Sequence, residues 1–300
     1  MNDERLERKG YNFTMDELRR IQLIQLEMLI EVDRICKKCG IKYCIVAGTL
    51  LGSVRHGGYI PWDDDADVSM LRPEYEKFRE ACKTELDTER FYFQDYKNTP
   101  GYRWGYGKLR RKGTEFVRLN QEHMPYEQGI FIDVFPYDNV PDNYLLRCIH
   151  NFHCFVYRKI FWSAVGRKSE KLILRLIYSI LYKIPEKKLY ERYEKFIEKS
   201  NRKKGKLIRV LTFPTPNRVF GYDRRWWEDL SDKVFEGYIF KGARDYDGYL
   251  SFKYGDYMTL PPVEKRKVHP VSKLKLVEND LIREKLSGGA KNDVKSEIYI

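Results

Sequence analysis

Four aspartates within five positions, directly behind a turn of small residues, limit the folds open to this chain more than any other part of its sequence. They are Asp63, Asp64, Asp65 and Asp67, in the segment AGTLLGSVRHGGYIPWDDDADVSM that spans residues 47–70. Carboxylates this close repel one another strongly unless protons or a cation neutralise them. Because hard divalent cations prefer oxygen ligands, the run predicts a site for Mg²⁺ or Mn²⁺.

The residues that follow the turn have the pattern of a strand, and this pattern assigns the metal ligands. Side chains two positions apart in an extended chain point to the same face, so Asp65 and Asp67 are predicted to bind one ion together. The same alternation predicts that Asp64 faces away from the ion.

A later apolar strand, GIFIDVFP at residues 129–136, carries Asp133 among Ile, Phe and Val side chains. An unpaired charge in such surroundings is costly, so Asp133 needs a cation or hydrogen-bond donors. It is therefore predicted to be a third metal ligand. The alternative is a structural carboxylate held by backbone amides.

Hydrophobic periodicity along the first 142 residues alternates between helix and strand. A capping box of Thr14 and Glu17 begins a helix that ends at Gly40. Further helices are expected at 48–55 and 73–84, and strands at 41–46, 66–70, 91–94, 106–110, 115–119 and 129–136. The fold class we expect from these elements is α+β, with a mixed β-sheet core flanked by helices.

Residues 143–204 have the pattern of two or three basic amphipathic helices, interrupted near Gly166 and Pro185. The expected division is a catalytic core at 1–142, a basic helical insert at 143–204, a C-terminal part of the catalytic region at 205–285 and a disordered tail at 286–300. Two roles for the insert stay open. Its helices either lie on an anionic membrane surface or pack on the core as an ordinary helical subdomain, because a helix with apolar and basic faces suits both.

The formal net charge of +12 favours a polyanionic partner, and an aromatic share of 15% excludes a disordered chain. No specific nucleic-acid partner is expected, because basic residues are spread along the chain and the aspartates would repel phosphates. The N-terminus lacks the apolar region of a signal peptide, and residues 172–184 are too short and too charged to span a bilayer. These features predict a cytoplasmic protein, which the insert could hold on the inner membrane face. Six cysteines are then expected as free thiols, at spacings unlike those of a zinc ribbon.

The small-residue turn before the aspartates supplies a second part of a phosphate site. Backbone amides near Gly48, Thr49 and Gly52, at the start of a helix, can hold a phosphate beside a metal ion bound by carboxylates. Such a turn, a D-x-D on the following strand and a third acidic residue on a later strand are together the parts of a nucleotidyltransferase-like fold.

Four segments carry a resemblance to a known family: AGTLLGSVRHGGYIPWDDDAD, GKLRRKGTEF, GIFIDVFPYD and KYGDYMTLPPVEKR, with His269 and Pro270 beyond. Together they resemble the LicD family, whose pattern runs G-T-L-L-G-x-x-R-x-x-x-x-I-P-W-D-D-D-x-D and continues with I-D-V/I-F-P and Y-G-x-x-Y/W-x-x-P-P. The resemblance extends from the first helix to about Pro270, except for the insert. Ala66 departs from it, since members usually have a β-branched residue there.

The resemblance implies a phosphotransferase that moves phosphocholine, or a related phospho-alcohol, from CDP-choline or another CDP-alcohol to a hydroxyl of a cell-surface glycan. Such acceptors include lipopolysaccharide, teichoic acid and capsule, and some are lipid-linked. The family is similar to the fukutin-related enzymes, which transfer ribitol phosphate from CDP-ribitol. Asp65 and Asp67 match the family's metal-binding pair and Asp63 a further acidic position, while His269 stands where members often carry more than one His. Asp133 or Asp63 is expected to be the general base.

The remaining candidates are substrate-binding residues. Arg55, Lys108 and Arg110 are expected to hold the donor phosphates, and Trp62 to stack on the cytosine or the sugar. Two alternatives to this function remain. One is a nucleotidyltransferase that releases pyrophosphate from an NTP, and the other is a basic protein that binds membranes or nucleic acid without turnover.

Overall fold

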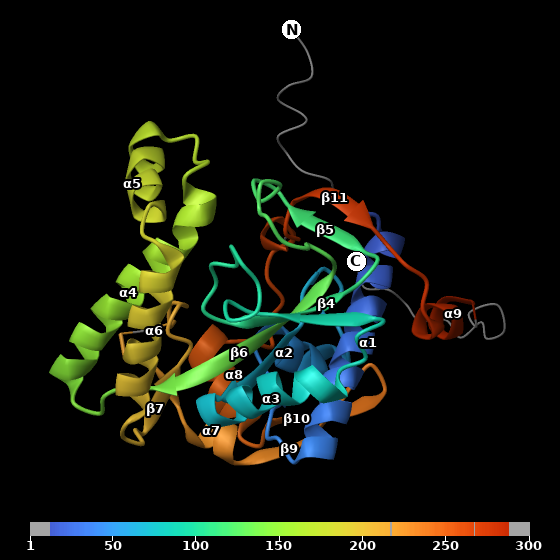
Figure 1. Ribbon diagram of the computed structural model, residues 1–300. Coiled ribbons are helices and arrows are strands. Elements are labelled where there is room, and N and C mark those ends of the chain that lie inside the picture. The colour runs from blue at the N-terminus through green and yellow to red at the C-terminus, as the bar shows by residue number, and fades with distance from the viewer. Residues whose placement is uncertain (1–12, 217, 267, 288–300) are drawn as a thin grey trace, which may run out of the picture.

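A computed structural model of the protein describes residues 13–216, 218–266 and 268–287 and consists of a mixed β-sheet flanked by helices (Figure 1). Helix α1 (Met15–Cys39) begins where predicted, because Thr14 and Glu17 form a reciprocal capping box. It ends at Gly40, whose φ of 64° is left-handed. The predicted α+β class and the first helix are therefore confirmed.

The central sheet has the strand order β1-β2-β6-β4-β3, and β7 and β8 extend it from the end of β6. Strands β2 and β6 are parallel, whereas their pairings with β1 and β4 are antiparallel, so the sheet is mixed as expected. The strands are β1 (Cys44–Ile45), β2 (Asp67–Leu71), β3 (Phe91–Gln94), β4 (Gly107–Arg111), β6 (Phe131–Asn139), β7 (Leu207–Arg209) and β8 (Tyr222–Asp223).

Two helices cover the strands that carry the acidic residues. Helix α1 packs against β4 and β6, and α3 (Arg72–Glu85) packs against β2 and β6. Helix α2 (Ala47–His56) joins β1 to β2, so the small-residue turn and the aspartate run stand at two ends of one connection. This connection positions the candidate site.

Later parts of the chain return to this core. The hairpin of β9 (Leu230–Phe235) and β10 (Tyr238–Ala243) lies beside β1 and α2, and α9 (Asp280–Ser287) packs on α1. Strand β5 pairs with β11, which brings the C-terminal region back over the aspartates. The remaining elements are β5 (Glu115–Arg118), α7 (Arg225–Glu228), α8 (Tyr246–Tyr254), the 3-10 helix η2 (Val263–Lys265) and β11 (Val271–Lys275). Of the tail expected at 286–300, the first two residues end α9 and residues 288–300 lie outside the described residues.

Residues 143–204 fold into α4 (Tyr144–Gly166), α5 (Leu172–Tyr182) and α6 (Glu186–Asn201), with the breaks at the predicted places. In Figure 1 these helices stand beside the sheet as an arm, with α5 at its tip. Asn201 ties the arm to the sheet, because its side-chain amide donates to Asp138 at 2.6 Å. That these residues form a separate insert stays a prediction. Within the described part of the chain, no helix combines the length and apolarity needed to cross a bilayer.

Candidate functional site

The start of α2 is shaped by three contacts. Ala47 has a φ of 50°, and its N–H donates to the hydroxyl of Tyr249 at 3.2 Å. The hydroxyl of Thr49 accepts from the N–H of Asp67 at 2.8 Å, which fixes the beginning of β2 against the helix. A Cβ at Gly48 would lie 2.6 Å from Oδ2 of Asp63, so the glycine leaves room for that carboxylate beside the helix N-terminus.

Gly52 has a different role from the one expected of a phosphate turn. A Cβ there would lie 2.3 Å from the carbonyl oxygen of Gly58. Backbone packs directly on backbone at this point, so the absence of a side chain lets the loop after α2 fold back. Whether Gly52 also contacts a phosphate stays a prediction.

The parallel pairing of β2 with β6 places Asp67 directly opposite Asp133. Burial, followed by the charges of Asp65 and Asp64, raises the pKa of Asp63 to about 8. Burial also raises the pKa of Asp65, and it raises the pKa of Asp67 well above its usual range, with contributions from Asp65 and Asp133. The structure therefore gathers acidic groups without enough positive charge to balance them.

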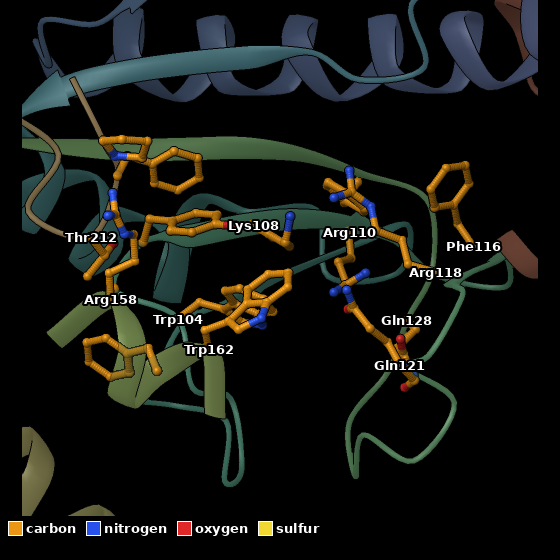
Figure 2. Close-up of a pocket in the computed structure, with 16 residues that line it drawn as sticks. Trp104, Lys108, Arg110, Phe116, Arg118, Gln121, Gln128, Arg158, Trp162 and Thr212 are labelled. Carbon is orange, nitrogen blue, oxygen red and sulfur yellow. The ribbon is translucent and has the colours of Figure 1, made fainter. Parts of the chain in front are cut away.

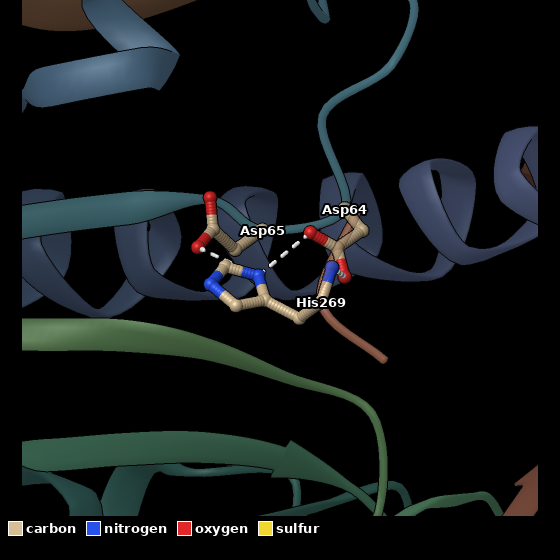
Figure 3. Close-up of side chains that lie close together, drawn as sticks. All are labelled: Asp64, Asp65 and His269. Atoms are coloured by element: carbon tan, nitrogen blue, oxygen red, sulfur yellow. Dashed lines mark hydrogen bonds and ion pairs between the residues drawn. The ribbon is translucent and has the colours of Figure 1, made fainter. Parts of the chain in front are cut away.

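Asp64 lies in a different contact from the one predicted (Figure 3). Its side chain is 1% exposed and accepts the backbone N–H of His269 at 3.0 Å, while Nδ1 of His269 lies 2.9 Å from its Oδ1. The same Nδ1 lies 3.8 Å from Oδ2 of Asp65. One ligand atom of each residue falls within 4.8 Å of the others, so the three could hold a metal ion.

The prediction that Asp64 faces away from the metal ion stays a prediction, and the grouping of its carboxylate with Asp65 and His269 speaks against it. Strand β2 begins at Asp67, so the strand alternation does not reach back to Asp64 and Asp65. Sequence reasoning also missed the contact of Asp64 with His269, because these residues are 205 positions apart and nothing local indicates their pairing.

Two lysines approach the carboxylates. Lys108 lies opposite Asp133 in the antiparallel register, and its ammonium group forms a hydrogen-bonded ion pair with that carboxylate. Burial lowers the pKa of Lys108 to about 7, although Asp133 opposes the shift. Burial lowers the pKa of Lys253 on α8, and the negative charge of Asp67 opposes this shift. Lys253 was not predicted, yet it lies in the KYGDY motif, which could have indicated it.

A cavity of about 270 Å³ opens beside Lys108 (Figure 2). Arg110 and Arg118 line it together with aromatic rings that include Trp104 and Trp162. Arg110 is already engaged, since it donates to Gln94 at 2.6 Å and to the carbonyl of Gly129 at 2.8 Å. Nε of Arg118 is buried and finds no hydrogen-bond partner among the described residues. The cavity is suited to an anion beside an aromatic wall.

A smaller cavity of about 100 Å³ is lined by Asp67, Lys253 and Ala47. Both cavities include Phe213 and Pro214 in their walls. Because Asp67 faces the smaller one and Lys108, the partner of Asp133, faces the larger one, the acidic pair lies where the two meet.

Two residues that were predicted to bind the substrate, Arg55 and Trp62, contact a different set of side chains. Arg55 donates to the carbonyl oxygen of Tyr257 at 2.6 Å, and burial lowers its pKa. Trp62 is half-buried beneath Arg266, whose guanidinium lies 4.5 Å from the ring centroid. Tyr254 connects this group to the aspartates, since burial and then Asp67 raise its pKa. A role for Arg55 and Trp62 in substrate binding stays a prediction.

The mixed sheet, the helix that starts at a small-residue turn and the acidic pair on neighbouring strands define a nucleotidyltransferase-like domain. Residues 40–161 match the family model described as LicD/FKTN/FKRP, nucleotidyltransferase domain. This match agrees with the resemblance that the sequence motifs indicated, and it is limited to residues 40–161.

Two relatives show how far the similarity extends. The chain is 29% identical over 263 residues to the lipopolysaccharide cholinephosphotransferase LicD of Haemophilus influenzae, which covers 85% of this chain and 96% of the relative. An uncharacterized protein of Rickettsia typhi is 37% identical over 68 residues, 23% of this chain and 21% of its own length. The chain is therefore a homologue of a LicD-type transferase along most of its length.

Proposed function

We propose that this protein transfers phosphocholine, or a related phospho-alcohol, from a CDP-alcohol to a hydroxyl of a cell-surface glycan and releases CMP. The observation that carries the proposal is the convergence of Asp63, Asp65, Asp67 and Asp133 beside the N-terminus of α2. The substrate class follows the printed name of the Haemophilus influenzae relative, a lipopolysaccharide cholinephosphotransferase.

The acidic residues fit a divalent metal ion. Their pKa values are raised because buried carboxylates repel one another, and a cation would relieve this repulsion. Oxygen donors of this kind suit Mg²⁺ or Mn²⁺. Asp65, Asp67 and Asp133 would hold the ion, and Asp65 also belongs to the group with Asp64 and His269. When bound, the ion would offset negative charge on the diphosphate and on the CMP leaving group.

The residues around the cavity would bind and orient the donor. Lys108 and Arg118 face the cavity with cationic groups, and the buried Nε of Arg118 has a donor to spare among the described contacts. Arg110 would support them through charge, since its own hydrogen bonds are already made. The N–H groups of Gly48 and Thr49 at the start of α2 would bind phosphate oxygens.

The aromatic wall of the same cavity fits a choline head group. The rings of Trp104 and Trp162 meet edge to face, with centroids 5.8 Å apart. A quaternary ammonium is attracted to such faces. This arrangement favours choline over ribitol as the transferred alcohol.

The chemical step would proceed as a single displacement. The acceptor hydroxyl oxygen attacks the β-phosphorus, the bond from that phosphorus to the oxygen of CMP breaks, and the hydroxyl proton moves to a carboxylate. Asp63 is the first candidate for this base: its pKa of about 8 keeps it protonated at pH 7 in the absence of a cation, and a bound cation beside it would lower that pKa and free the carboxylate to take the proton. Asp133 is the second candidate, although its ion pair with Lys108 makes it less available.

The test is CMP release from a panel of CDP-alcohols in Mg²⁺ or Mn²⁺, with a glycan acceptor. Asp65→Asn and Asp67→Asn should each abolish release, whereas Asp232→Asn, an exposed carboxylate on β9, should leave it unchanged. Pyrophosphate from an NTP, with no CMP from any CDP-alcohol, would support the alternative of a nucleotidyltransferase. Full activity in both cluster variants would contradict the proposal.

A further inference from the structure

Helix α5 exposes apolar side chains on almost all of its faces. Among its described residues only Tyr178 is buried. Six side chains are 41 to 73% exposed: Leu172, Ile173, Leu174, Leu176, Ile177 and Ile180. A helix that is apolar all round normally lies inside a protein core or against lipid. Here it stands at the tip of the arm, away from the sheet (Figure 1).

Two tyrosines hold α5 in this position. The ring of Tyr178 packs on Gly166, where a Cβ would lie 2.3 Å from it. The ring of Tyr182 lies under Arg167, with 3.8 Å from the guanidinium to the centroid, and under Arg103 at 4.8 Å. The helix is therefore fixed to α4 along one side, and its remaining apolar side chains point outward.

Helix α4 continues this surface. Five of its exposed apolar residues recur at helical spacing and are 42 to 72% exposed: Leu145, Ile149, Phe152, Phe155 and Trp162. These five side chains and the six of α5 form what we call the α4–α5 surface. Exposed apolar side chains gathered on two packed helices in this number mark a site of interaction.

The charge around the α4–α5 surface indicates its partner. Residues 143–185 contain eight Lys and Arg and one acidic residue, Glu170. Lys168, Lys171 and Arg175 are exposed next to the apolar side chains. A second copy of the chain would bring the same positive charge against itself, which disfavours self-association. Anionic lipid head groups complement both the charge and the apolar side chains.

We infer that the α4–α5 surface docks on an anionic lipid bilayer. The eleven residues of α5 extend about 16 Å, roughly half the thickness of the hydrocarbon core, so the helix lies within the interface instead of spanning it. Of the two roles left open by the sequence, this inference favours the membrane surface.

Docking would also place the larger cavity next to the membrane. Arg158, Phe161 and Trp162 of α4 line that cavity, and Trp162 belongs to the α4–α5 surface as well. An acceptor glycan attached to a lipid would then reach the cavity from the bilayer. This last step rests on the proposed function, whereas docking does not.

The test measures binding of the full chain to vesicles of phosphatidylglycerol and of phosphatidylcholine by flotation. We expect binding to phosphatidylglycerol to be about tenfold tighter or more, and to weaken at high salt. The variant Ile173→Gln/Leu176→Gln/Ile180→Gln should lose about tenfold or more in affinity. Its matched control is Val234→Gln/Ile239→Gln, where two equally exposed apolar residues of the β9–β10 hairpin are replaced.

A second pair of variants tests the charge without touching apolar residues. Lys168→Gln/Lys171→Gln should weaken binding to anionic vesicles about tenfold, at about 1.4 kcal/mol for each factor of ten. Lys77→Gln/Lys83→Gln on α3 should bind like the unmodified chain. Circular dichroism verifies that each variant is folded.

Three results would overturn the inference. One is an unmodified chain that does not bind anionic vesicles. Another is equal binding by the α5 variant and its control. The third is a dimer in sedimentation velocity that the α5 variant converts to a monomer, which would make a second copy the partner. Each result is independent of CMP release, so it leaves the proposed function standing.

Discussion

Asp67→Asn should stabilise the metal-free protein, although it removes a group from the candidate site. Asp67 faces Asp133 across neighbouring parallel strands, and burial followed by Asp65 and Asp133 raises its pKa well above the usual range. The folded state therefore keeps a proton that the unfolded state releases. The resulting loss of stability begins near the unfolded pKa of about 4 and grows as the pH rises. The asparagine variant lacks this dependence.

The size of the effect follows from the strand spacing. If both were ionised, two carboxylates about 5 Å apart in surroundings of effective dielectric about 20 would repel by roughly 3 kcal/mol, which is the upper limit of what holding the proton on Asp67 costs. The ion pair of Lys108 with Asp133 offsets part of this repulsion. We therefore expect Asp67→Asn to raise the free energy of unfolding by about 1 to 2 kcal/mol at pH 8 in EDTA.

The assay is urea denaturation followed by fluorescence, in EDTA and in Mg²⁺. Magnesium should stabilise the unmodified chain through binding to the folded state and stabilise Asp67→Asn less, so their difference shrinks or reverses. The control is Asp138→Asn, a buried carboxylate paired with Arg72 through hydrogen bonds of 2.7 and 2.6 Å. It should lose about 3 kcal/mol in both solutions, because the substitution leaves the buried Arg72 with only its longer ion pair to Glu76, at 3.4 Å.

The reasoning is refuted if Asp67→Asn is destabilised in EDTA as Asp138→Asn is. Equal stabilisation of Asp67→Asn and the unmodified chain by Mg²⁺ would refute the assignment of Asp67 as a metal ligand while leaving the repulsion argument intact.

Two further predictions concern a histidine and two glycines. Burial lowers the pKa of His150 to about 3, so the folded state lacks a proton that the unfolded state binds below pH 6.5. The free energy of unfolding, measured by urea titration, should therefore fall by about 2 kcal/mol from pH 6.5 to pH 5. His150→Gln should remove this fall, and an unchanged fall in the variant would contradict the assignment to His150. Gly48→Ala should abolish CMP release without loss of stability, since only the end of the Asp63 side chain must move. Gly52→Ala should instead lower the free energy of unfolding by about 1 to 3 kcal/mol, measured by thermal or urea unfolding, because its Cβ meets the backbone of Gly58. A destabilised Gly48→Ala together with a Gly52→Ala of unchanged stability would contradict these two assignments.

Local signals in the sequence predicted most of the elements that carry the site. The capping box at Thr14, the glycine at position 40 and the breaks near 166 and 185 all depend on neighbouring residues, so the sequence shows them directly. Asp133 was found in the same way, because a carboxylate inside an apolar strand is a local anomaly. Its pairing with Asp67 depends on the parallel register, which the sequence did not specify.

Contacts between distant segments were not predictable from the sequence pattern. The pairing of β5 with β11 joins residues more than 150 positions apart, and it brings His269 to Asp64. Lys253 reaches Asp67 only because α8 packs on α2. The KYGDY motif contains Lys253 and could have indicated the residue, but not its approach to Asp67.

The four aspartates consequently divide into two kinds, which their spacing in the sequence did not reveal. Asp64 is the buried one, and it binds the segment at His269 through both its carboxylate oxygens. Asp63, Asp65 and Asp67 remain partly exposed and carry raised pKa values. Asp64 therefore stabilises the closure of the C-terminal region over the site, whereas the other three keep the unbalanced charge that a metal ion and a phosphate donor would neutralise together. A run of identical residues thus contains one residue that holds a distant segment beside three candidate metal ligands, and only the fold separates them.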